Sequence, residues 1–546
     1  MKQIESNFVK SIIEDDLKEG RVKEIVTRFP PEPNAYMHIG HARAIVTNFE
    51  LAKEFGGKTN LRFDDTNPVK EDTEFVEGII EDIKWLGYTP DGIYYGSDYF
   101  SLQYDLAVKL IKDGKAYVCN LSPEQINEYR GTFEKPGVNS PYRDRSVEEN
   151  LKLFSDMKNR KFKEGEAVLR AKIDMAHENI NMRDPVLYRI SYANHHRQKD
   201  NWVIYPMYDF AHPLQDAFEG ITHSLCSLEF ANHRILYDWV INNTGIVKKP
   251  HQYEFGRLNI QNTVTSKRYL RLLVEKGMVS GYDDPRLPSL RGLRRRGVTP
   301  SAIRNFILDT GLSRTNATVS EEMFYSEVRD DLKLSSKRTM AVIDPLKITI
   351  ENYPEDKVEY FEVLNNQENE SLGTHKISFS KHLYIEKDDF LEVKPNNKYK
   401  RLSLGDEVRL MNTYFIKASK VVKDKKGNVV EVICTYDPLT KSGSGFNERK
   451  PNGTISFVDE KTALSARFNL INELFLGEVT NQEEVLEKFN KDSLVVKNGF
   501  VSMGTYLKEE HYQIIRDGYY IVDSTEPLTF NRTVSLKANK ISNEFK

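Results

Sequence analysis

Residues 26–45 constrain the fold of this chain more than any other stretch. The alternation over 22–29 predicts a strand, and the prolines within 30–34 exclude a helix there. An apolar stripe over 42–55, followed by Gly56 and its neighbouring glycine, predicts a helix that ends at those glycines. The stretch therefore runs from a strand through a stiff turn into a helix.

His38 and His41 lie in this turn, on either side of Gly40. Helix N–H groups and the positive end of the helix dipole attract an anion at such a point, and Gly40 lets a phosphate or a base approach the backbone. Two imidazoles there can donate hydrogen bonds to charge that develops on a phosphate. The four residues alone also fit histidines that cap the helix or pack inside the protein.

A second strand and helix follow, over 59–63 and 71–86, so that the order is strand, helix, strand, helix. This alternation predicts a parallel, doubly wound sheet with ligands beyond the carboxyl ends of its strands. Asp64 lies at such an end, where a loop carboxylate is most often merely solvated or marks a helix start.

From Tyr99 to about Lys199 the pattern changes to that of an insertion. Two helix starts carry capping boxes, at Ser122 and Ser146, and alternation over 169–175 predicts a strand. Phe133 lies in a polar turn between the helices, either folded back on its own domain or exposed as a wedge that stacks on a terminal base pair.

We expect the catalytic sheet to resume over 202–210 and to continue through 221–230. His195 and His196 could suggest a metal site, but neighbouring strand residues face opposite sides, and no nearby residues complete a ligand set in the sequence. We therefore interpret the pair as a surface feature.

The loop 264–268 ends in Lys267 and Arg268. A lysine on a mobile loop is usually only solvated, but across a nucleotide pocket its ammonium group can neutralise phosphate charge. The region 269–335 looks mainly helical, with one helix from Thr299 to Gly311. Its basic run, 291–297, fits either a salt-bridged surface or phosphate contact.

After about residue 337 short strands recur, with a hairpin turn at 426–428. Their spacing suggests two small β-barrels with basic loops. The architecture predicted for the whole chain is therefore multidomain α/β plus β: a Rossmann-type doubly wound catalytic domain (1–98 and 200–268), an inserted α+β domain (99–199), a helical connector (269–336) and two C-terminal β-barrels (337–546).

The composition excludes several classes of protein. A net charge of -3 with 29% charged residues excludes an indiscriminate, generally basic nucleic-acid binder, so any RNA contact must be local. Only 3 cysteines occur, too far apart for a C-x-x-C metal site or a disulfide framework, which fits a reducing cytosol. No apolar stretch is long enough for a membrane span, and the start does not read as a signal peptide, so we expect a cytoplasmic protein without a membrane role.

The two signature elements, around His38 and Lys267, resemble those of class I aminoacyl-tRNA synthetases, and the chain is similar almost end to end to the glutaminyl-tRNA synthetase family. The residues that carry this resemblance are 28–45, 61–72, 139–146, 205–210, 220–226, 264–268, 292–297 and 341–345.

The resemblance implies activation of L-glutamine by ATP with Mg²⁺, followed by transfer to the terminal ribose of tRNA(Gln), with no tightly bound protein metal. It implies catalytic roles for His38, His41 and Lys267, and a glutamine site formed by Arg28, Asp64 and Tyr208. The implied ATP site comprises Glu32, Pro33, Asn34, His38, Ile39, Gly40, His41, Ala42, Arg43, Ala44, Ser227, Arg257, Leu258, Thr265, Ser266 and Lys267.

It further implies that the insertion receives the acceptor end of the tRNA and that the barrels read the anticodon. The tRNA-binding candidates are Phe133, Asn232, Arg338, Lys398 and Arg401. Thr265, Asn232 and Phe133 stand where the family usually has Met, an acidic residue and Leu. The nearest alternative is a glutamyl-tRNA synthetase with the same type of barrels, and we expect a monomer in either case.

Overall fold

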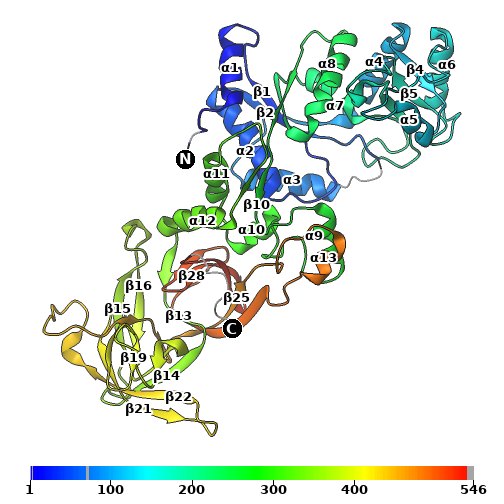
Figure 1. Cartoon of the computed structure of the whole chain (residues 1–546). Coiled ribbons are helices and arrows are strands. Elements are labelled where there is room, and N and C mark those ends of the chain that lie inside the picture. Colours follow the sequence, from blue (N-terminus) through cyan, green and yellow to red (C-terminus); the bar gives the residue numbers. More distant parts are fainter. Residues whose placement is uncertain (1, 3, 69–72, 538–546) are drawn as a thin grey trace. The chain divides into compact units, whose positions relative to one another are not determined.

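The structure, a computed structural model, describes residues 2, 4–68 and 73–537 (Figure 1). By internal contacts the chain divides into two units, Met1–Gln261 with Arg304–Val319, and Asn262–Ile303 with Ser320–Lys546. The helix α11 (Pro300–Asp309) contains the point at which the chain passes from the second unit to the first. Among the described residues, no helix has both the length and the apolar character that a bilayer crossing requires.

The first unit is built on parallel strands. β1 (Val26–Phe29), β2 (Lys58–Phe63) and β3 (Ile93–Tyr95) form one sheet, and β8 (His223–Ser227) pairs with β9 (His251–Phe255). The Thr222 N–H donates to the Val26 carbonyl at 2.9 Å and so joins β8 to the free edge of β1. The resulting order β3-β2-β1-β8-β9 is that of a doubly wound fold, and it reverses between β1 and β8. The predicted fold class is confirmed.

Two helices follow the first two strands. α2 (Ile39–Glu54) lies against β1 and β2 (Figure 1) and buries most of its residues, whereas α3 (Thr73–Trp85) buries one face. α2 begins before the predicted Ala42 because His38 caps it. β1 begins at Val26 instead of Val22. The predicted helix start at Glu71 lies outside the described residues.

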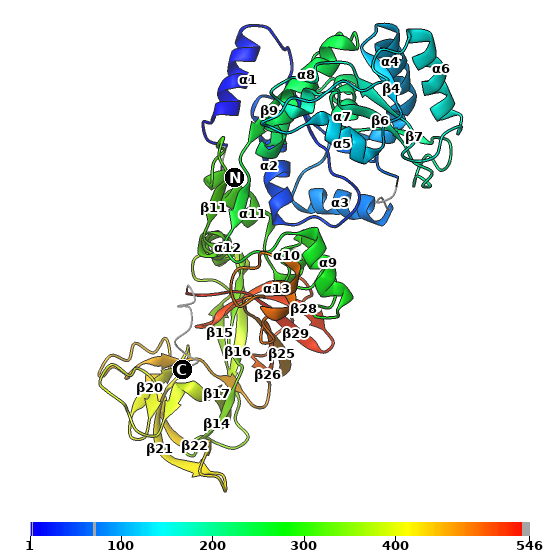
Figure 2. The ribbon, with the colours of Figure 1, turned by 45° about the vertical axis from the view of Figure 1, so that its right-hand side comes forward.

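The insertion contains three helices and an antiparallel sheet of order β4-β5-β6-β7. Figures 1 and 2 show α4 and α6 side by side next to this sheet. Ser122 and Ser146 are the N-cap residues of α5 and α6, and the full capping box predicted at both is formed at Ser122 with Gln125. The elements are α4 (Phe100–Lys112), α5 (Pro123–Arg130), α6 (Val147–Lys158), β4 (Ala116–Cys119), β5 (Val168–Ala171), β6 (Val186–Ile190) and β7 (Ile204–Pro206).

The strand predicted over 202–210 was assigned to the wrong sheet. β7 pairs antiparallel with β6 of the insertion, Tyr205 opposite Arg189, and the chain turns into α7 (Tyr208–Phe218) directly afterwards. The strand predicted over 169–175 is also shorter, because the Ile173 N–H donates to the Asp184 carboxylate at 2.7 Å. Alternation indicates a strand, but it does not specify the partner. The first unit is completed by α1 (Phe8–Lys18), α8 (Arg234–Asn243), β10 (Leu258–Ile260) and β11 (Ala317–Val319).

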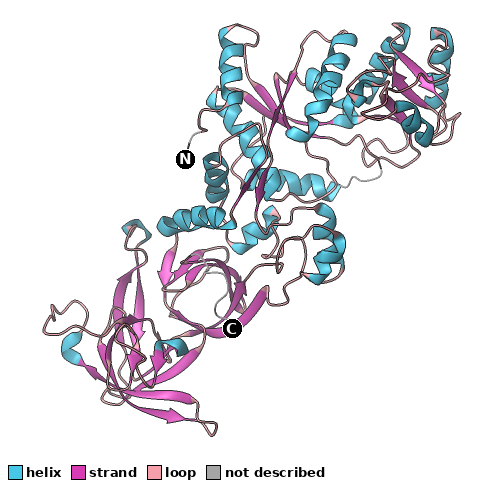
Figure 3. Ribbon diagram, viewed as in Figure 1, coloured by secondary structure: helices cyan, strands magenta, loops and turns pink. Residues whose placement is uncertain are grey.

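The second unit contains two seven-stranded sheets, each around its own apolar core. Figure 3 shows the strands of this unit in magenta. One has the order β23-β20-β21-β22-β14-β17-β24 and the other β12-β27-β28-β29-β25-β26-β13. β12 (Lys337–Thr339) and β13 (Ala341–Val342) thus complete the sheet formed by the last strands of the chain. The two barrel-like domains predicted from strand spacing are confirmed.

The first of these sheets lies within 345–459. The hairpin turn predicted at 426–428 joins β21 to β22, with Gly427 at φ +85°. The strands of this sheet are β14 (Pro345–Ile350), β17 (His382–Glu386), β20 (Glu407–Leu410), β21 (Phe415–Lys423), β22 (Val429–Asp437), β23 (Thr454–Ile455) and β24 (Val458–Asp459).

The last strands of the chain and the connector helices complete the unit. The strands are β25 (Leu464–Ile471), β26 (Leu494–Val501), β27 (His511–Ile514), β28 (Gly518–Thr525) and β29 (Leu528–Ser535). The helices are α9 (Lys267–Glu275), α10 (Leu290–Arg296), α12 (Glu321–Ser335) and α13 (Gln482–Glu487).

Candidate active site

The carboxyl ends of β1 and β8 are where a doubly wound sheet places its ligand. Pro30 follows β1, and Ser227 ends β8. The turn with His38 and His41 connects β1 to α2, so it lies at this edge of the sheet. The fold therefore brings the predicted nucleotide turn and Ser227, which lie far apart in the sequence, to the same edge.

Both histidines of the turn are bound to the start of α2 through Nδ1. His38 is the N-cap residue, and its Nδ1 accepts the Gly40 N–H at 3.1 Å. The His41 Nδ1 accepts the His38 N–H, also at 3.1 Å, and the ring centroids are 3.9 Å apart. Of the alternatives that the sequence left open for these histidines, the structure shows that both take part in capping the helix.

This capping arrangement sets the tautomer of both rings. A neutral imidazole whose Nδ1 accepts a hydrogen bond carries its proton on Nε2, where it is a donor. His38 and His41 each have such a donor on the side of the ring away from the cap. A Cβ on Gly40 would come within 2.9 Å of the His38 ring, so glycine is also required to keep this ring in place.

The other predicted nucleotide residues of the first unit differ in what their side chains do. Arg43 is 4% exposed and donates to the Gly256 and Gly311 carbonyls, so its side chain links α2 to the segments around these two glycines. Burial lowers the pKa of Arg43 to about 10. Ile39 and the alanines at 42 and 44 lie in the first turns of α2, and Glu32, Pro33 and Asn34 precede it.

Ser227 and Arg257 share a partner that sequence reasoning missed. The Ser227 hydroxyl donates to Glu229 at 2.9 Å, and Arg257 forms an ion pair with the same carboxylate. This pairing, led by the Arg257 hydrogen bond, lowers the pKa of Glu229. Leu258 follows at the start of β10. The sequence signal that could have indicated this partner is Glu229 itself, an acidic residue two positions after the end of β8.

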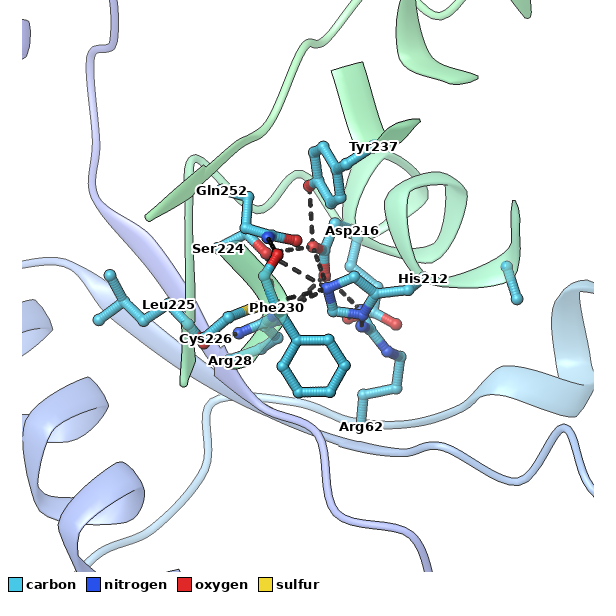
Figure 4. A network of polar contacts seen from close by, with 12 residues as sticks. Arg28, Arg62, His212, Asp216, Ser224, Leu225, Cys226, Phe230, Tyr237 and Gln252 are labelled. Carbon is cyan, nitrogen blue, oxygen red and sulfur yellow. Dashed lines mark hydrogen bonds and ion pairs between the residues drawn. The ribbon is translucent and has the colours of Figure 1, made fainter. Parts of the chain in front are cut away.

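Arg28 is fully buried in a polar network (Figure 4). Its Nε donates to Asp216 at 3.0 Å, and Arg62 donates to the same carboxylate oxygen at 2.8 Å. Figure 4 shows the Tyr237 hydroxyl pointing at Asp216 as well, at 2.9 Å. The other polar atoms around Arg28 are the Leu225 carbonyl, Ser224 Oγ, His212 Nε2 and the Cys226 sulfur.

The network fixes the charge of its members. Burial alone would raise the pKa of Asp216, but Arg28, His212 and Arg62 hold it below its usual range. His212 has an arginine against each ring nitrogen, and burial lowers its pKa to about 3. Burial raises the pKa of Glu219, the second partner of Arg62, to about 7. At neutral pH Asp216 is therefore ionised and His212 is neutral.

Asp64 and Tyr208 lie next to this network. Burial raises the pKa of Asp64 from 3.8 to about 6, although Arg62 opposes the shift. Tyr208 stacks on His212, with ring centroids 4.9 Å apart, and packs against Phe230 at 5.2 Å. The three residues predicted to bind glutamine thus lie close together. Arg28, however, is fully buried and paired with Asp216, so its side chain supports the site without lining it.

Asp65, His195 and His196 form the one group of possible metal ligands found among the described residues. His195 is buried, so the surface interpretation of this pair is wrong, and the residue that completes the group comes from the distant segment after β2. The His195 Nδ1 accepts the N–H groups of Arg197 and Gln198, so its Nε2 carries a proton and donates to the Asp65 carbonyl at 2.7 Å. A protonated nitrogen cannot bind a metal, and the group is a hydrogen-bonded cluster.

The insertion and the helix after β8 hold two predicted tRNA residues. Phe133 is 85% exposed, so the wedge interpretation fits and the folded-back alternative does not. Asn232 is exposed on the 3₁₀ turn Leu228–His233, and its carbonyl accepts the Asn179 side-chain N–H at 2.8 Å. Its side chain is therefore presented on a turn that the insertion supports.

The remaining predicted residues belong to the second unit. Lys267 is exposed at the first position of α9, Ser266 is the N-cap residue, and Thr265 precedes it. Arg338 donates to Gln513 at 2.9 Å and lines a cavity of about 220 Å³. Lys398 is exposed, whereas Arg401 pairs with Asp389 at 3.3 Å.

The basic run 291–297 is used largely inside the protein. Arg295 pairs with Asp523 on β28 at 2.9 Å, and Arg296 donates to the Thr533 carbonyl on β29 at 3.1 Å. These contacts dock α10 on the C-terminal sheet. For Arg295 and Arg296 the salt-bridged interpretation holds over the phosphate contact.

Comparison with known proteins defines the class. Residues 24–334 match the family model of the catalytic domain of class I tRNA synthetases (E and Q), and residues 336–437 and 454–523 match two models of their anti-codon binding domain. The chain belongs to this family. It is 54% identical over 543 residues to the glutamine–tRNA ligase of Clostridium kluyveri, covering 98% of each chain. It is 53% identical to the enzyme of the same name from Clostridium perfringens and 52% identical to that of Clostridioides difficile, again over 98% of each chain.

Proposed function

We propose that the chain is a glutamine–tRNA ligase. It activates L-glutamine with ATP, presented as the Mg²⁺ complex, and transfers the glutaminyl group to the terminal ribose of tRNA(Gln). The observation that carries this proposal is the identity of 54% along the full length to a glutamine–tRNA ligase. We further propose that it works as a monomer in the cytoplasm.

In the first step a carboxylate oxygen of glutamine attacks the α-phosphorus of ATP, and the bond to the bridging oxygen breaks in line, releasing pyrophosphate. The developing charge lies on phosphate oxygens, so positioned donors supply most of the catalysis. The Nε2–H groups of His38 and His41 have this role, with the Lys267 ammonium group as the flexible cation. The backbone of the turn 32–44, together with Ser227, Arg257, Leu258, Thr265 and Ser266, binds the rest of the nucleotide.

In the second step a ribose hydroxyl of the tRNA attacks the activated carbonyl carbon, and AMP leaves. The product is an ester, and the hydroxyl proton departs with the phosphate or to solvent. No side chain is assigned as the general base, since the leaving phosphate is itself a sufficient acceptor.

The buried network favours glutamine over glutamate. A pocket for glutamate needs a cation for the side-chain carboxylate, whereas glutamine needs neutral donors and acceptors. Here Arg28 and Arg62 are already paired with Asp216, and burial keeps His212 neutral by lowering its pKa to about 3. Asp64, opposite in charge to an ammonium group, takes the amino end, and Tyr208 takes the side chain.

The tRNA is bound by the insertion and by the two barrels. Phe133 acts as the wedge at the acceptor end, and Asn232 inspects the acceptor stem with donor and acceptor groups. Arg338, Lys398 and Arg401 contact the anticodon loop. In support, the β region matches models of anti-codon binding domains.

One assay tests the proposal. Purified protein is incubated with ATP and total tRNA, and charging with glutamine is compared with charging with glutamate. We expect kcat/KM for glutamine to exceed that for glutamate by at least 100-fold. Charging with glutamate that is equal or better would favour the glutamyl-tRNA synthetase alternative, and no charging with either amino acid would overturn both.

A further inference from the structure

The end of β6 and the segment that follows it contact the coil after β2 at several points. Arg189 donates to the Asn67 side-chain oxygen at 3.1 Å, His195 Nε2 to the Asp65 carbonyl at 2.7 Å, and His196 Nε2 to the Asp65 carboxylate at 3.0 Å. We call residues 189–198 the clasp. It connects the insertion to the residues of the proposed amino-acid site.

The clasp also contacts the turn after β3. Arg197 donates to Asp98 at 2.8 Å and lies 3.7 Å from the centroid of the Tyr95 ring, and the Gln198 amide donates to the Ser97 carbonyl at 3.1 Å. The clasp is therefore anchored independently of Asp65, and its position does not depend on one hydrogen bond.

Asp65 is buried and receives three hydrogen bonds on its carboxylate. The Ser97 N–H donates at 2.7 Å, the Ser97 hydroxyl at 2.6 Å, and His196 at 3.0 Å. An ionised carboxylate accepts only, so the proton of each contact belongs to Ser97 or to His196. Of these donors, His196 alone comes from the insertion.

Asp64 is attached directly to this anchored residue but has few contacts of its own. Its N–H donates to the Pro31 carbonyl at 2.9 Å, and its carboxylate accepts the Thr66 hydroxyl at 3.2 Å. The segment 64–67 is neither helix nor strand, so no ladder of backbone bonds fixes its direction. The orientation of the Asp64 side chain therefore depends on how its neighbour Asp65 is held.

We propose that His196 is a positioning residue for glutamine binding: its hydrogen bond to Asp65 sets the direction of the Asp64 carboxylate. The inference rests on the proposed function, in which Asp64 binds the glutamine ammonium group. Misplacement of a group in an active site by about 1 Å can cost about 100-fold in rate. His196 acts on Asp64 only through the neighbouring Asp65, so we expect a smaller effect, an increase of about tenfold in KM for glutamine.

The test compares His196→Ala with His196→Gln in the full chain by aminoacylation of tRNA. His196→Ala should raise KM for glutamine about tenfold, with KM for ATP and for tRNA unchanged. His196→Gln keeps an N–H donor at a similar reach and should restore KM to within about threefold of the unmodified enzyme. Asp200→Ala is the matched control, because Asp200 lies in the same loop, is exposed, and faces Arg160 at 4.0 Å.

A double-mutant cycle separates positioning from general loosening of the loop. If His196 acts through Asp64, the change His196→Ala should raise KM for glutamine less than twofold in an Asp64→Asn background. A full additional tenfold increase there would overturn the proposal, as would an unchanged KM in the His196→Ala single variant. Parallel increases in KM for glutamine, ATP and tRNA would show a structural effect and would also count against it.

Failure of this inference is distinguishable from failure of the proposed function. If the unmodified protein does not charge tRNA with glutamine, the function is wrong. If it does so, but the histidine variants bind glutamine normally, only the positioning role is lost.

Discussion

Arg28 on β1 and Asp216 on α7 form an ion pair in which neither side chain is exposed, with 3.0 Å between Nε and Oδ1. The same carboxylate pairs with Arg62 on β2 at 2.8 Å. One acidic side chain thus compensates two buried cations and joins a helix to two strands. Because the pair lies beneath the proposed amino-acid site, changes there test both stability and specificity.

Replacing Asp216 by Asn should strongly destabilise the first unit. Removing one partner from a buried charge network leaves the arginines uncompensated, at a cost of about 3–5 kcal/mol. Thermal unfolding followed by circular dichroism should show a clear loss of stability in the transition of this unit. Asp238→Asn, on the exposed side of the neighbouring α8, is the control and should leave the transition in place. An unchanged transition in Asp216→Asn would contradict the compensation argument.

Changes at His41 should separate its two roles. His41→Ala removes both the cap acceptor and the Nε2 donor, and should reduce ATP–pyrophosphate exchange by about 100-fold, as for one lost transition-state donor. His41→Asn keeps an oxygen that can accept the His38 N–H but has no donor at the Nε2 position. We expect it to retain stability and to lose exchange nearly as much.

The exchange assay should be run with and without tRNA, and tRNA binding should survive in both His41 variants. Normal exchange in His41→Asn would show that capping is the only role of this ring.

Glutamine binding should weaken as the pH falls through about 6. Burial raises the pKa of Asp64 to about 6, so its carboxylate is mostly ionised at pH 7 and mostly protonated at pH 5. Only the ionised form attracts an ammonium group, and KM for glutamine should rise by about tenfold for each pH unit below the pKa. The measurement is KM against pH between 5 and 8.

The control for this profile is Glu219→Gln, because burial raises the pKa of Glu219 to about 7 and it titrates nearby. The rise in KM should persist in Glu219→Gln and disappear in Asp64→Asn. A profile that is flat in the unmodified enzyme would count against Asp64 as the ammonium partner.

Neutralising Arg401 should weaken tRNA binding without an effect on the amino-acid site. Arg401→Ala should raise KM for tRNA and reduce the salt dependence of binding, because one phosphate contact is lost. Arg401 also pairs with Asp389, which Arg516 holds through two further bonds of 2.7 and 2.8 Å, so the fold should tolerate the change. An unchanged KM for tRNA at moderate salt, with normal stability, would remove Arg401 from the anticodon contacts.

Local signals predicted turns and helix starts well. The turn of 30–34 and the capping positions at Ser122 and Ser146 depend on residues within a few positions of each other. The role of His38 and His41 as caps was also open to prediction, because a cap involves only its own helix start. Where the sequence was misread, as for β7 and for the His195–His196 pair, the partner lay far away in the chain.

The amino-acid sequence by itself therefore determined the strand–turn–helix unit, the alternation that makes the first sheet parallel, and the presence of two β domains. Only the tertiary structure decided which residues enclose Arg28, since these partners lie 184 to 198 positions further along the chain. It also decided that β12 and β13 complete the last sheet and that His196 contacts Asp65. The physical reason is range. Propensity and capping act within one helical turn or strand, whereas buried charges and strand edges are satisfied by whichever distant segments the packed fold brings to them.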